Sequence, residues 1–185
     1  MAQRPSQILA LGGGGFLVHT RPTPLDDVLL GLAKVARPRI CFVGTASGDD
    51  PSVIDRFYTA FAQRDCELSH LPLFLRDERQ PRDILLAQDI IFVGGGNTVN
   101  LLAVWRAHGV DLAMREAYER GIVLAGISAG ALCWFEGGTT DSYGPLAPLH
   151  DGLGLLSGSV CPHYSGEPER PAVYHAAIRA GLKSG

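Results

Sequence analysis

The regular alternation of short apolar runs with longer amphipathic runs is the feature that most constrains the fold. Five runs predict strands that end at small or turn residues: 7–13, 39–46, 66–74, 89–96 and 121–128. Three runs carry apolar residues at helical spacing: 24–36, 51–64 and 99–121, the last with a predicted break near His108 and Gly109. Strands that are almost wholly apolar are covered on both faces, as in a parallel sheet between two helical layers. Residues 1–185 are therefore expected to form one α/β domain, with ligands bound beyond the carboxyl ends of the strands.

Composition and charge exclude several classes of protein. With 185 residues, 46% of them hydrophobic, the chain can build one substantial core but not two comfortable ones. The net charge of −3 gives no electrostatic reason to expect a nucleic acid as partner. No run approaches the roughly 20 apolar residues of a membrane helix, and the N-terminus resembles a first strand more than a signal peptide. The 4 cysteines show neither CxxC pairs nor zinc spacing, which is typical of thiols in a reducing compartment. A soluble cytoplasmic protein without a membrane or nucleic-acid partner is expected.

The pattern changes at about Gly137, where the chain becomes rich in glycine, proline and serine. One strand is predicted at 155–161 and a last helix at 172–182, and the rest is expected to be loop. A loop region of this length in a compact domain is usually functional or disordered.

The sequence Gly-Ile-Ser-Ala-Gly at 126–130 follows a predicted strand and opens a helix. This is the context of a nucleophile elbow, in which a sharp turn projects Ser128 above the sheet edge. The positions two before and two after the serine must be nearly free of side chains, or strand and helix would collide. The N–H of Ala129 can then help to stabilise an oxyanion. The alternative is a glycine-rich turn with an incidental capping serine.

A serine nucleophile needs a general base, and His163 is the candidate. It follows an apolar run and a proline, at a strand end that can hold a base rigidly. The alternative is a loop histidine in water. The other histidines carry no comparable signal: His19, His70, His108, His150 and His175.

Two glycine clusters follow predicted strands. The first, at 94–96, lets backbone N–H groups approach a ligand, and could supply an oxyanion donor or bind phosphate. Asn97 and Thr98 can cap the next helix, and the absence of a following lysine excludes a P-loop. The second cluster, at 12–15, fails the dinucleotide pattern and is interpreted as a turn near the site.

The motifs "VGGGNT", "GISAGA" and "PHYS", in that order, resemble those of the peptidase E (aspartyl dipeptidase) family of serine peptidases, whose relatives include the cyanophycinases. The resemblance runs from residue 7 to about 180. It implies a mainly parallel, three-layer α/β sandwich of the class I glutamine amidotransferase-like, or flavodoxin-like, type. It also implies a cytoplasmic exopeptidase that removes an N-terminal aspartate from dipeptides, its small peptide substrates, without metal or cofactor. A homodimer is compatible with it.

The resemblance assigns roles residue by residue. Ser128 matches the nucleophile and His163 the base. The oxyanion-hole region is matched by Gly95, Gly96 and Ala129. Positions that contact the substrate are matched by Asn97, Ser165 and Arg170, and the arginine suits the carboxylate of a substrate aspartate.

The chain departs from the family pattern at the acid that completes the triad, which should follow His163 by a longer stretch than the sequence contains. None of the nearby acids matches it: Glu136, Asp141, Glu167 and Glu169. The expectation is therefore that the C-terminal part of the domain is missing or the orienting carboxylate is lost, which puts the activity of this form in doubt. Two alternatives stay open. One is a catalytically impaired protein that binds small molecules, and the other is a carboxylesterase, which the missing HGGG-type loop disfavours.

Overall fold

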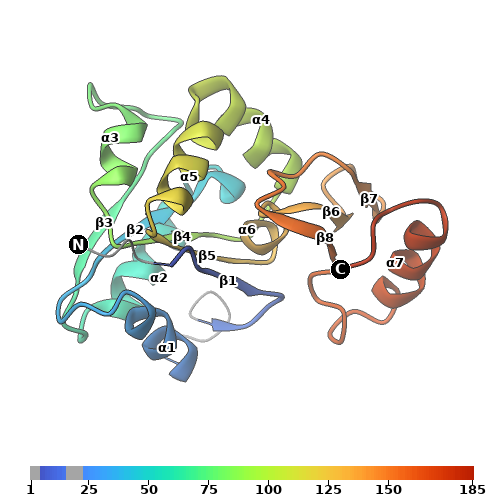
Figure 1. Ribbon diagram of the computed structural model, residues 1–185, viewed down its shortest axis with the longest axis horizontal. Helices are drawn as coiled ribbons and strands as arrows, with labels where there is room; N and C mark the ends of the chain where they lie inside the picture. Colours follow the sequence, from blue (N-terminus) through green and yellow to red (C-terminus); the bar gives the residue numbers. More distant parts are fainter. Residues whose placement is uncertain (1–4, 16–22) are drawn as a thin grey trace.

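A five-stranded parallel sheet lies at the centre of the computed structural model, which describes residues 5–15 and 23–185 (Figure 1). Its strands are β1 (Ile8–Leu11), β2 (Arg39–Val43), β3 (Glu67–His70), β4 (Ile90–Val93) and β5 (Val123–Ile127). The order across the sheet is β1-β5-β4-β2-β3, and every pairing in it is parallel. The apolar runs of the sequence thus form the parallel sheet that they predict.

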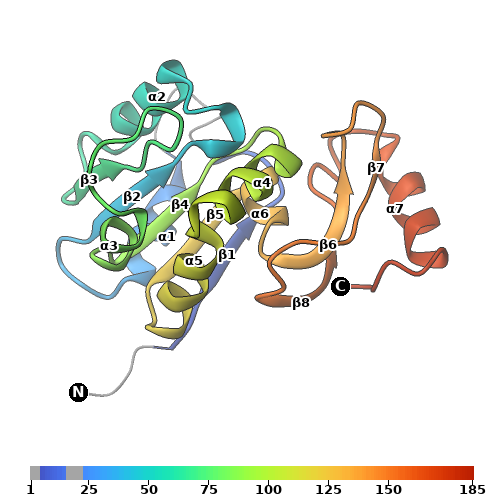
Figure 2. The same ribbon diagram turned by 90° about the horizontal axis from the view of Figure 1, so that it is seen from above.

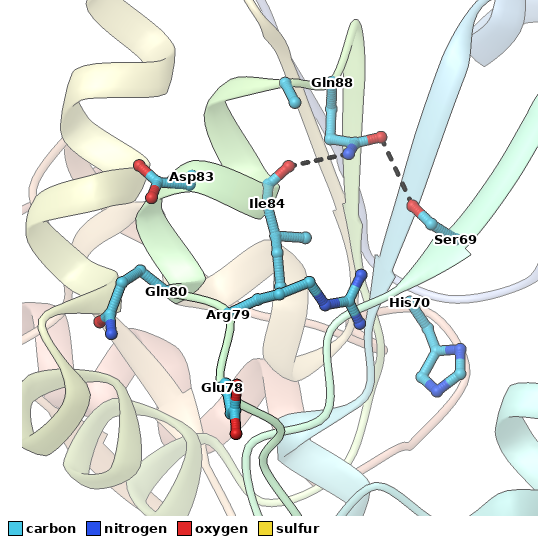
Figure 3. Close-up of a pocket in the computed structure, with 9 residues that line it drawn as sticks. Ser69, His70, Glu78, Arg79, Gln80, Asp83, Ile84 and Gln88 are labelled. Atoms are coloured by element: carbon cyan, nitrogen blue, oxygen red, sulfur yellow. Dashed lines mark hydrogen bonds between the residues drawn. The ribbon is translucent and has the colours of Figure 1, made fainter.

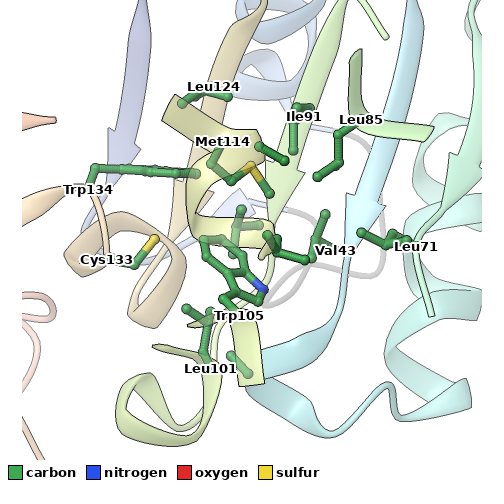
Figure 4. Close-up of a cluster of buried hydrophobic side chains, with 14 of the residues drawn as sticks. Val43, Leu71, Leu85, Ile91, Leu101, Trp105, Met114, Leu124, Cys133 and Trp134 are labelled. Atoms are coloured by element: carbon green, nitrogen blue, oxygen red, sulfur yellow. The ribbon is translucent and has the colours of Figure 1, made fainter. Parts of the chain in front are cut away.

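Helices cover both faces of this sheet (Figures 1 and 2). One face carries α1 (Pro24–Leu32) and α2 (Pro51–Phe61), and the other carries α3 (Pro81–Leu86), α4 (Thr98–His108) and α5 (Val110–Glu119). Successive side chains of β2 point alternately to the two faces of the sheet. Ile40 and Phe42 belong to the core under α1 and α2, whereas Cys41 and Val43 belong to the core under α3, α4 and α5 (Figure 4). The expected three-layer α/β sandwich is confirmed.

Two local predictions can be compared with the structure in detail. The helical run 99–121 does break at Gly109, which adopts φ 67° and donates its N–H to the carbonyl of Trp105. The strand predicted over 66–74 ends earlier, at His70. The chain turns away there because the Asp49 carboxylate accepts hydrogen bonds from the N–H groups of Leu73 (2.6 Å) and Phe74 (3.1 Å).

The prediction of a mostly loop-like region after Gly137 is wrong. A second, three-stranded sheet of order β7-β6-β8 occupies this part of the chain. It lies beside the central sheet in both views (Figures 1 and 2). Its strands are β6 (Phe135–Thr140), β7 (Ala147–Leu149) and β8 (Leu156–Val160), and α7 (Arg170–Arg179) follows. Only β8 and α7 are close to the predicted elements.

The glycines that made this region resemble a loop are required by close strand pairing. A Cβ on Gly138 would lie 2.1 Å from the carbonyl oxygen of Val160, and one on Gly137 would lie 2.3 Å from that of Leu149. Glycine therefore allows the backbones to approach, rather than marking a turn. Among the helices of residues 5–15 and 23–185, none has the length and apolar character to cross a membrane.

Candidate active site

Ser128 stands at the junction of β5 and the short helix α6 (Ala129–Leu132), in a conformation that few residues adopt. Its backbone has φ 54° and ψ −112°. Such a conformation costs a non-glycine residue about 1–3 kcal/mol, so the surrounding structure must impose it. The elbow interpretation expects this strained backbone at a strand-helix junction.

The glycines on either side of Ser128 allow the sharp turn. A Cβ on Gly126 would lie 2.0 Å from the carbonyl oxygen of Gly130. A Cβ on Gly130 would lie 2.3 Å from the carbonyl oxygen of Val93, on the neighbouring strand β4. Neither position has room for a side chain, as the Gly-x-Ser-x-Gly spacing predicts.

His163 lies within hydrogen-bonding distance of this serine. Its Nε2 is 2.8 Å from Ser128 Oγ, although 35 positions separate the two residues in the chain. The histidine follows β8 and also has a positive φ, 58°. Its N–H donates to the carbonyl of Gly12 (3.1 Å), which ties it to the turn after β1. Strand ends from both sheets therefore bring the predicted nucleophile and base together.

The other side of the His163 ring faces glycine backbone. A Cβ on Gly13 would lie 3.1 Å from Nδ1, so a side chain there would fit only if the ring shifted. Within the described ranges, 5–15 and 23–185, no carboxylate is hydrogen-bonded to this ring. Glu136 instead pairs with Lys183, while Glu167 and Asp141 pair with Arg170.

Two of the three residues predicted for the oxyanion hole, Gly95 and Ala129, lie next to Ser128. A Cβ on Gly95 would lie 3.3 Å from Ser128 Cβ, which shows how closely this loop approaches the serine. Gly96 has φ 138°, and a Cβ there would lie 2.1 Å from the carbonyl oxygen of Ala46. Ala129 begins α6, so its N–H is among the first-turn donors that lack an acceptor within the helix. Their role in stabilising an oxyanion stays a prediction.

Asn97 caps α4, as one of the predicted roles for it requires. Its Oδ1 accepts a hydrogen bond from the N–H of Asn100 (2.8 Å), and its Nδ2 donates to the carbonyl of Ser142 (3.1 Å). Ser142 also accepts the N–H of Thr98 at its Oγ (2.8 Å). Both ends of the Asn97 side chain thus have partners in the protein, and its contact with a substrate stays a prediction.

Ser165 is exposed and lines a cavity of about 440 Å³ beside His163. The turn predicted near the site forms the opposite wall, and the full lining is Gly12, Gly13, Gly14, Cys161, His163, Tyr164, Ser165 and Gly166. A serine hydroxyl at this position can hydrogen-bond a bound molecule, and this role also stays a prediction.

Arg170, the third predicted substrate contact, is buried. Only 4% of its surface is exposed. Its Nε donates to Glu167 (2.5 Å) and its Nη2 lies 3.5 Å from Asp141 Oδ2. A substrate carboxylate that binds this guanidinium would therefore have to compete with an acid of the protein.

The sequence of the whole chain agrees with this local geometry. The sequence model of peptidase family S51 matches residues 8–183. The chain belongs to peptidase family S51. It is 51% identical over 172 residues to the uncharacterized peptidase YgaJ of Bacillus subtilis, a match that covers 93% of this chain and 74% of YgaJ.

Two further S51-related comparisons are informative. Peptidase E of Shewanella denitrificans is 31% identical over 113 residues, which is 60% of this chain and 48% of that protein. The chain therefore matches about half the length of this relative. The crystal structure of a peptidase from an acI-B1 Actinobacterium superimposes with a TM-score of 0.70 at 18% identity, covering 91% of this chain and 75% of that one. This second likeness supports the fold.

The remaining histidines of this S51 protein lie apart from the site or have other partners. His70 Nδ1 is 2.9 Å from the hydroxyl of Tyr58, and Tyr164 contacts His175 Nε2 at the same distance. His19 lies outside the described residues.

A larger cavity of about 510 Å³ lies next to β3, at the far edge of the central sheet from β1 (Figure 3). Two of its polar side chains have partners in the protein. Gln88 donates to the carbonyl of Ile84 (2.8 Å), and Arg79 pairs with Asp77. Neither Ser128 nor His163 lines it, so size alone does not locate the chemistry of this protein.

Sequence reasoning did not single out Ser142, which contacts both Asn97 and Thr98. It holds the loop that carries Gly95 and Gly96, yet it lies in the stretch "TTDSYG", which carries no motif. Only the pairing of β6 with β7 and β8 brings it to the start of α4.

Proposed function

We propose that this chain is a serine exopeptidase that hydrolyses Asp-X dipeptides through an acyl-enzyme on Ser128. The observation that carries the proposal is the 2.8 Å contact between His163 Nε2 and Ser128 Oγ at a strained strand-helix turn. Nucleophile and base at this separation are the signature of covalent catalysis. Membership of peptidase family S51 supports the class of reaction.

The proposed acylation step uses only groups of this chain. Ser128 Oγ attacks the carbonyl carbon of the scissile bond while His163 Nε2 takes its proton. The N–H groups of Ala129 and of the Gly95–Gly96 loop stabilise the negative oxygen that forms. His163 then gives the proton to the leaving amine, and the C–N bond breaks.

Deacylation repeats these steps with water. His163 removes a proton from the water, whose oxygen attacks the ester carbon. His163 Nε2 then returns the proton to Ser128 Oγ, and the aspartate leaves. Neither step calls for a metal ion or a cofactor.

Preference for aspartate is the finer part of the proposal and rests on the family resemblance and on Arg170. A planar guanidinium can hold a carboxylate through two parallel hydrogen bonds. The longer of its two contacts, 3.5 Å to Asp141, is the one that a substrate carboxylate would replace. Asn97 and Ser165 are proposed to contact the rest of the dipeptide. We also propose a cytoplasmic location, since the cysteines are unpaired.

The experiment measures release of free aspartate from Asp-Leu and hydrolysis of a neutral activated ester. Ser128→Ala should lower both rates by a factor on the order of 10⁴ or more. Arg170→Ala should lower turnover of Asp-Leu about 10- to 100-fold more than that of the ester, because charge-assisted hydrogen bonds are lost for only one substrate. Equal losses on the two substrates would contradict the proposal that Arg170 binds the substrate carboxylate.

A catalytically impaired, small-molecule-binding protein is the second candidate. One observation favours it: within residues 5–15 and 23–185, no carboxylate is hydrogen-bonded to His163, and loss of such an acid costs a triad enzyme on the order of 10⁴ in turnover. On this view aspartate binds, as calorimetry can measure, while Asp-Leu hydrolysis stays at the rate of Ser128→Ala.

A further inference from the structure

The turn that follows His163 contains a charge pair whose glutamate, Glu167, has no role in the proposed chemistry. Glu167 and Arg170 are joined by a 2.5 Å contact between Oε2 and Nε. Arg170 is 4% exposed, whereas the side chain of Glu167 is 40% exposed. A buried arginine must keep its partners, because an uncompensated buried charge is strongly destabilising. The buried Arg170 therefore fixes the position of the more exposed Glu167 side chain.

Glu167 is also hydrogen-bonded to the backbone of His163. Its N–H donates to the carbonyl of His163 (3.0 Å), and so does the N–H of Gly166 (2.9 Å). The N–H of Arg170 in turn donates to the carbonyl of Glu167 (3.1 Å). These bonds form a compact turn from His163 to Arg170, fixed at its far end by the buried guanidinium.

His163 needs such support because its φ of 58° is unfavourable for a residue with a side chain. Without fixed partners the backbone would relax toward negative φ and swing the imidazole away from Ser128. A displacement of about 1 Å is enough to cost on the order of 10²-fold in a positioned reaction.

A second contact connects this turn to the loop between β6 and β7. Asp141 lies 3.5 Å from Arg170 Nη2, and the next residue, Ser142, accepts the N–H of Thr98 at the start of α4. The loop between β6 and β7 therefore touches both the base-bearing turn and the loop that holds Gly95 and Gly96.

We propose that Glu167, anchored by Arg170, is a positioning residue that holds the His163 imidazole against Ser128. The inference rests on the proposed function, since it assigns the two residues to the same reaction. It adds a role for Arg170 that is independent of any substrate carboxylate: the Nε side of the guanidinium secures the base, and the Nη2 side faces Asp141.

The test is the rate constant with which a neutral fluorophosphonate labels Ser128 of the full chain, followed by intact-protein mass. Glu167→Ala should slow labelling on the order of 10- to 100-fold while the final labelled fraction stays complete. Loss of folded protein would lower that fraction and leave the rate constant of the rest unchanged, so a purely structural role is distinguished. Glu167→Gln keeps an oxygen that can accept the Nε–H and should recover most of the rate. If the alanine variant does not fold, Glu167→Asp takes its place: its shorter side chain draws the carboxylate away from Arg170 Nε, so labelling should be slower than in the wild type, and a wild-type rate would overturn the inference.

The matched control is Glu116→Ala. Glu116 accepts hydrogen bonds from Arg82 (2.6 and 2.7 Å) and Arg120, on a part of the surface away from His163. Its loss should leave the labelling rate within twofold. Labelling of Glu167→Ala at the wild-type rate would overturn the inference. A wild-type chain that is not labelled at all would instead contradict the proposed function.

Discussion

Ser128 and His163 are two of the four described non-glycine residues with positive φ, and they face each other across one hydrogen bond. The Ser128 conformation could be predicted, because glycines at two residues before and after a serine are the signature of a tight elbow. The strain at His163 could not, since "CPHYS" contains no glycine to signal it. It depends on one distant partner, the carbonyl of Gly12, and on the N–H groups of Gly166 and Glu167 in the turn that follows.

The elbow predicts a sharp stability effect at Gly130. In Gly130→Ala the new methyl group would lie 2.3 Å from the carbonyl oxygen of Val93, a backbone atom that cannot move without disturbing β4. We expect the free energy of unfolding to fall by about 1–3 kcal/mol or more, as for an overpacked core, with loss of Ser128 labelling. Urea denaturation measures the first effect and fluorophosphonate labelling the second.

Gly31→Ala provides the matched control, because Gly31 lies within α1 and a Cβ there meets nothing within 4 Å. This change should be neutral or stabilising by up to about 1 kcal/mol. A Gly130→Ala protein as stable as Gly31→Ala would show that strand and helix can separate at the elbow.

At the scale of elements, the first N–H groups of α4 donate to one side chain at the start of the helix and to one from a distant part of the chain. Asn97 accepts the N–H of Asn100, and Ser142 accepts the N–H of Thr98. The second contact holds the helix start, and with it the Gly95–Gly96 loop, to the second sheet.

Ser142→Ala should therefore affect stability and chemistry together. Loss of a capping acceptor typically costs about 1 kcal/mol of unfolding free energy, and a looser Gly95–Gly96 loop should also lower turnover of the neutral ester severalfold. Ser6→Ala, which removes a hydroxyl that donates to the carbonyl of Tyr118, is the control and should leave turnover unchanged. If Ser142→Ala retains full turnover, the oxyanion donors do not depend on this contact.

The central sheet could be predicted from the sequence because strands that are buried on both faces are continuously apolar, as in the run "IIFV" of β4. The strand β6 of the second sheet has no such apolar run. The run "FEGGTT" of β6 is polar and glycine-rich because its neighbours approach so closely that only glycine fits at Gly137 and Gly138. The pairing of Ser128 with His163 could be predicted because each residue lies in a recognisable motif. The contact of Arg170 with Asp141 could not, because Asp141 reaches Arg170 only through the position of β6.

At the scale of the whole molecule, the two helical layers bury separate cores on the two faces of the sheet, and thiols are part of one of them. Cys41 and Cys133 both lie in the core under α3, α4 and α5, and both are 0% exposed. Burial raises the pKa of Cys41 from 9.0 to about 12 and that of Cys133 well above 9.0. Both thiols are therefore held protonated in the folded protein at pH values where the unfolded chain would lose the protons.

This difference predicts an alkaline limit to stability. Below pH 9 both states keep the protons, so these thiols add no pH dependence. Between pH 9 and about 12 the unfolded chain binds fewer protons than the folded protein, and the free energy of unfolding must fall as the pH rises. Each fully buried thiol contributes a slope of about −1.4 kcal/mol per pH unit in that window. Urea denaturation at pH 8, 9, 10 and 11 measures the total slope.

The contribution of Cys41 is isolated by the difference between the wild-type chain and Cys41→Ala, since lysines and tyrosines titrate equally in both. The variant is less stable at pH 8 because it leaves a small cavity, but its stability should fall less steeply above pH 9, so the two curves converge. Cys66→Ala is the control: Cys66 is only partly buried, its pKa is raised less, and the slope should change less. Parallel curves for Cys41→Ala and wild type would mean that water reaches the Cys41 thiol in the folded state, and that the core on this face of the sheet opens locally at high pH.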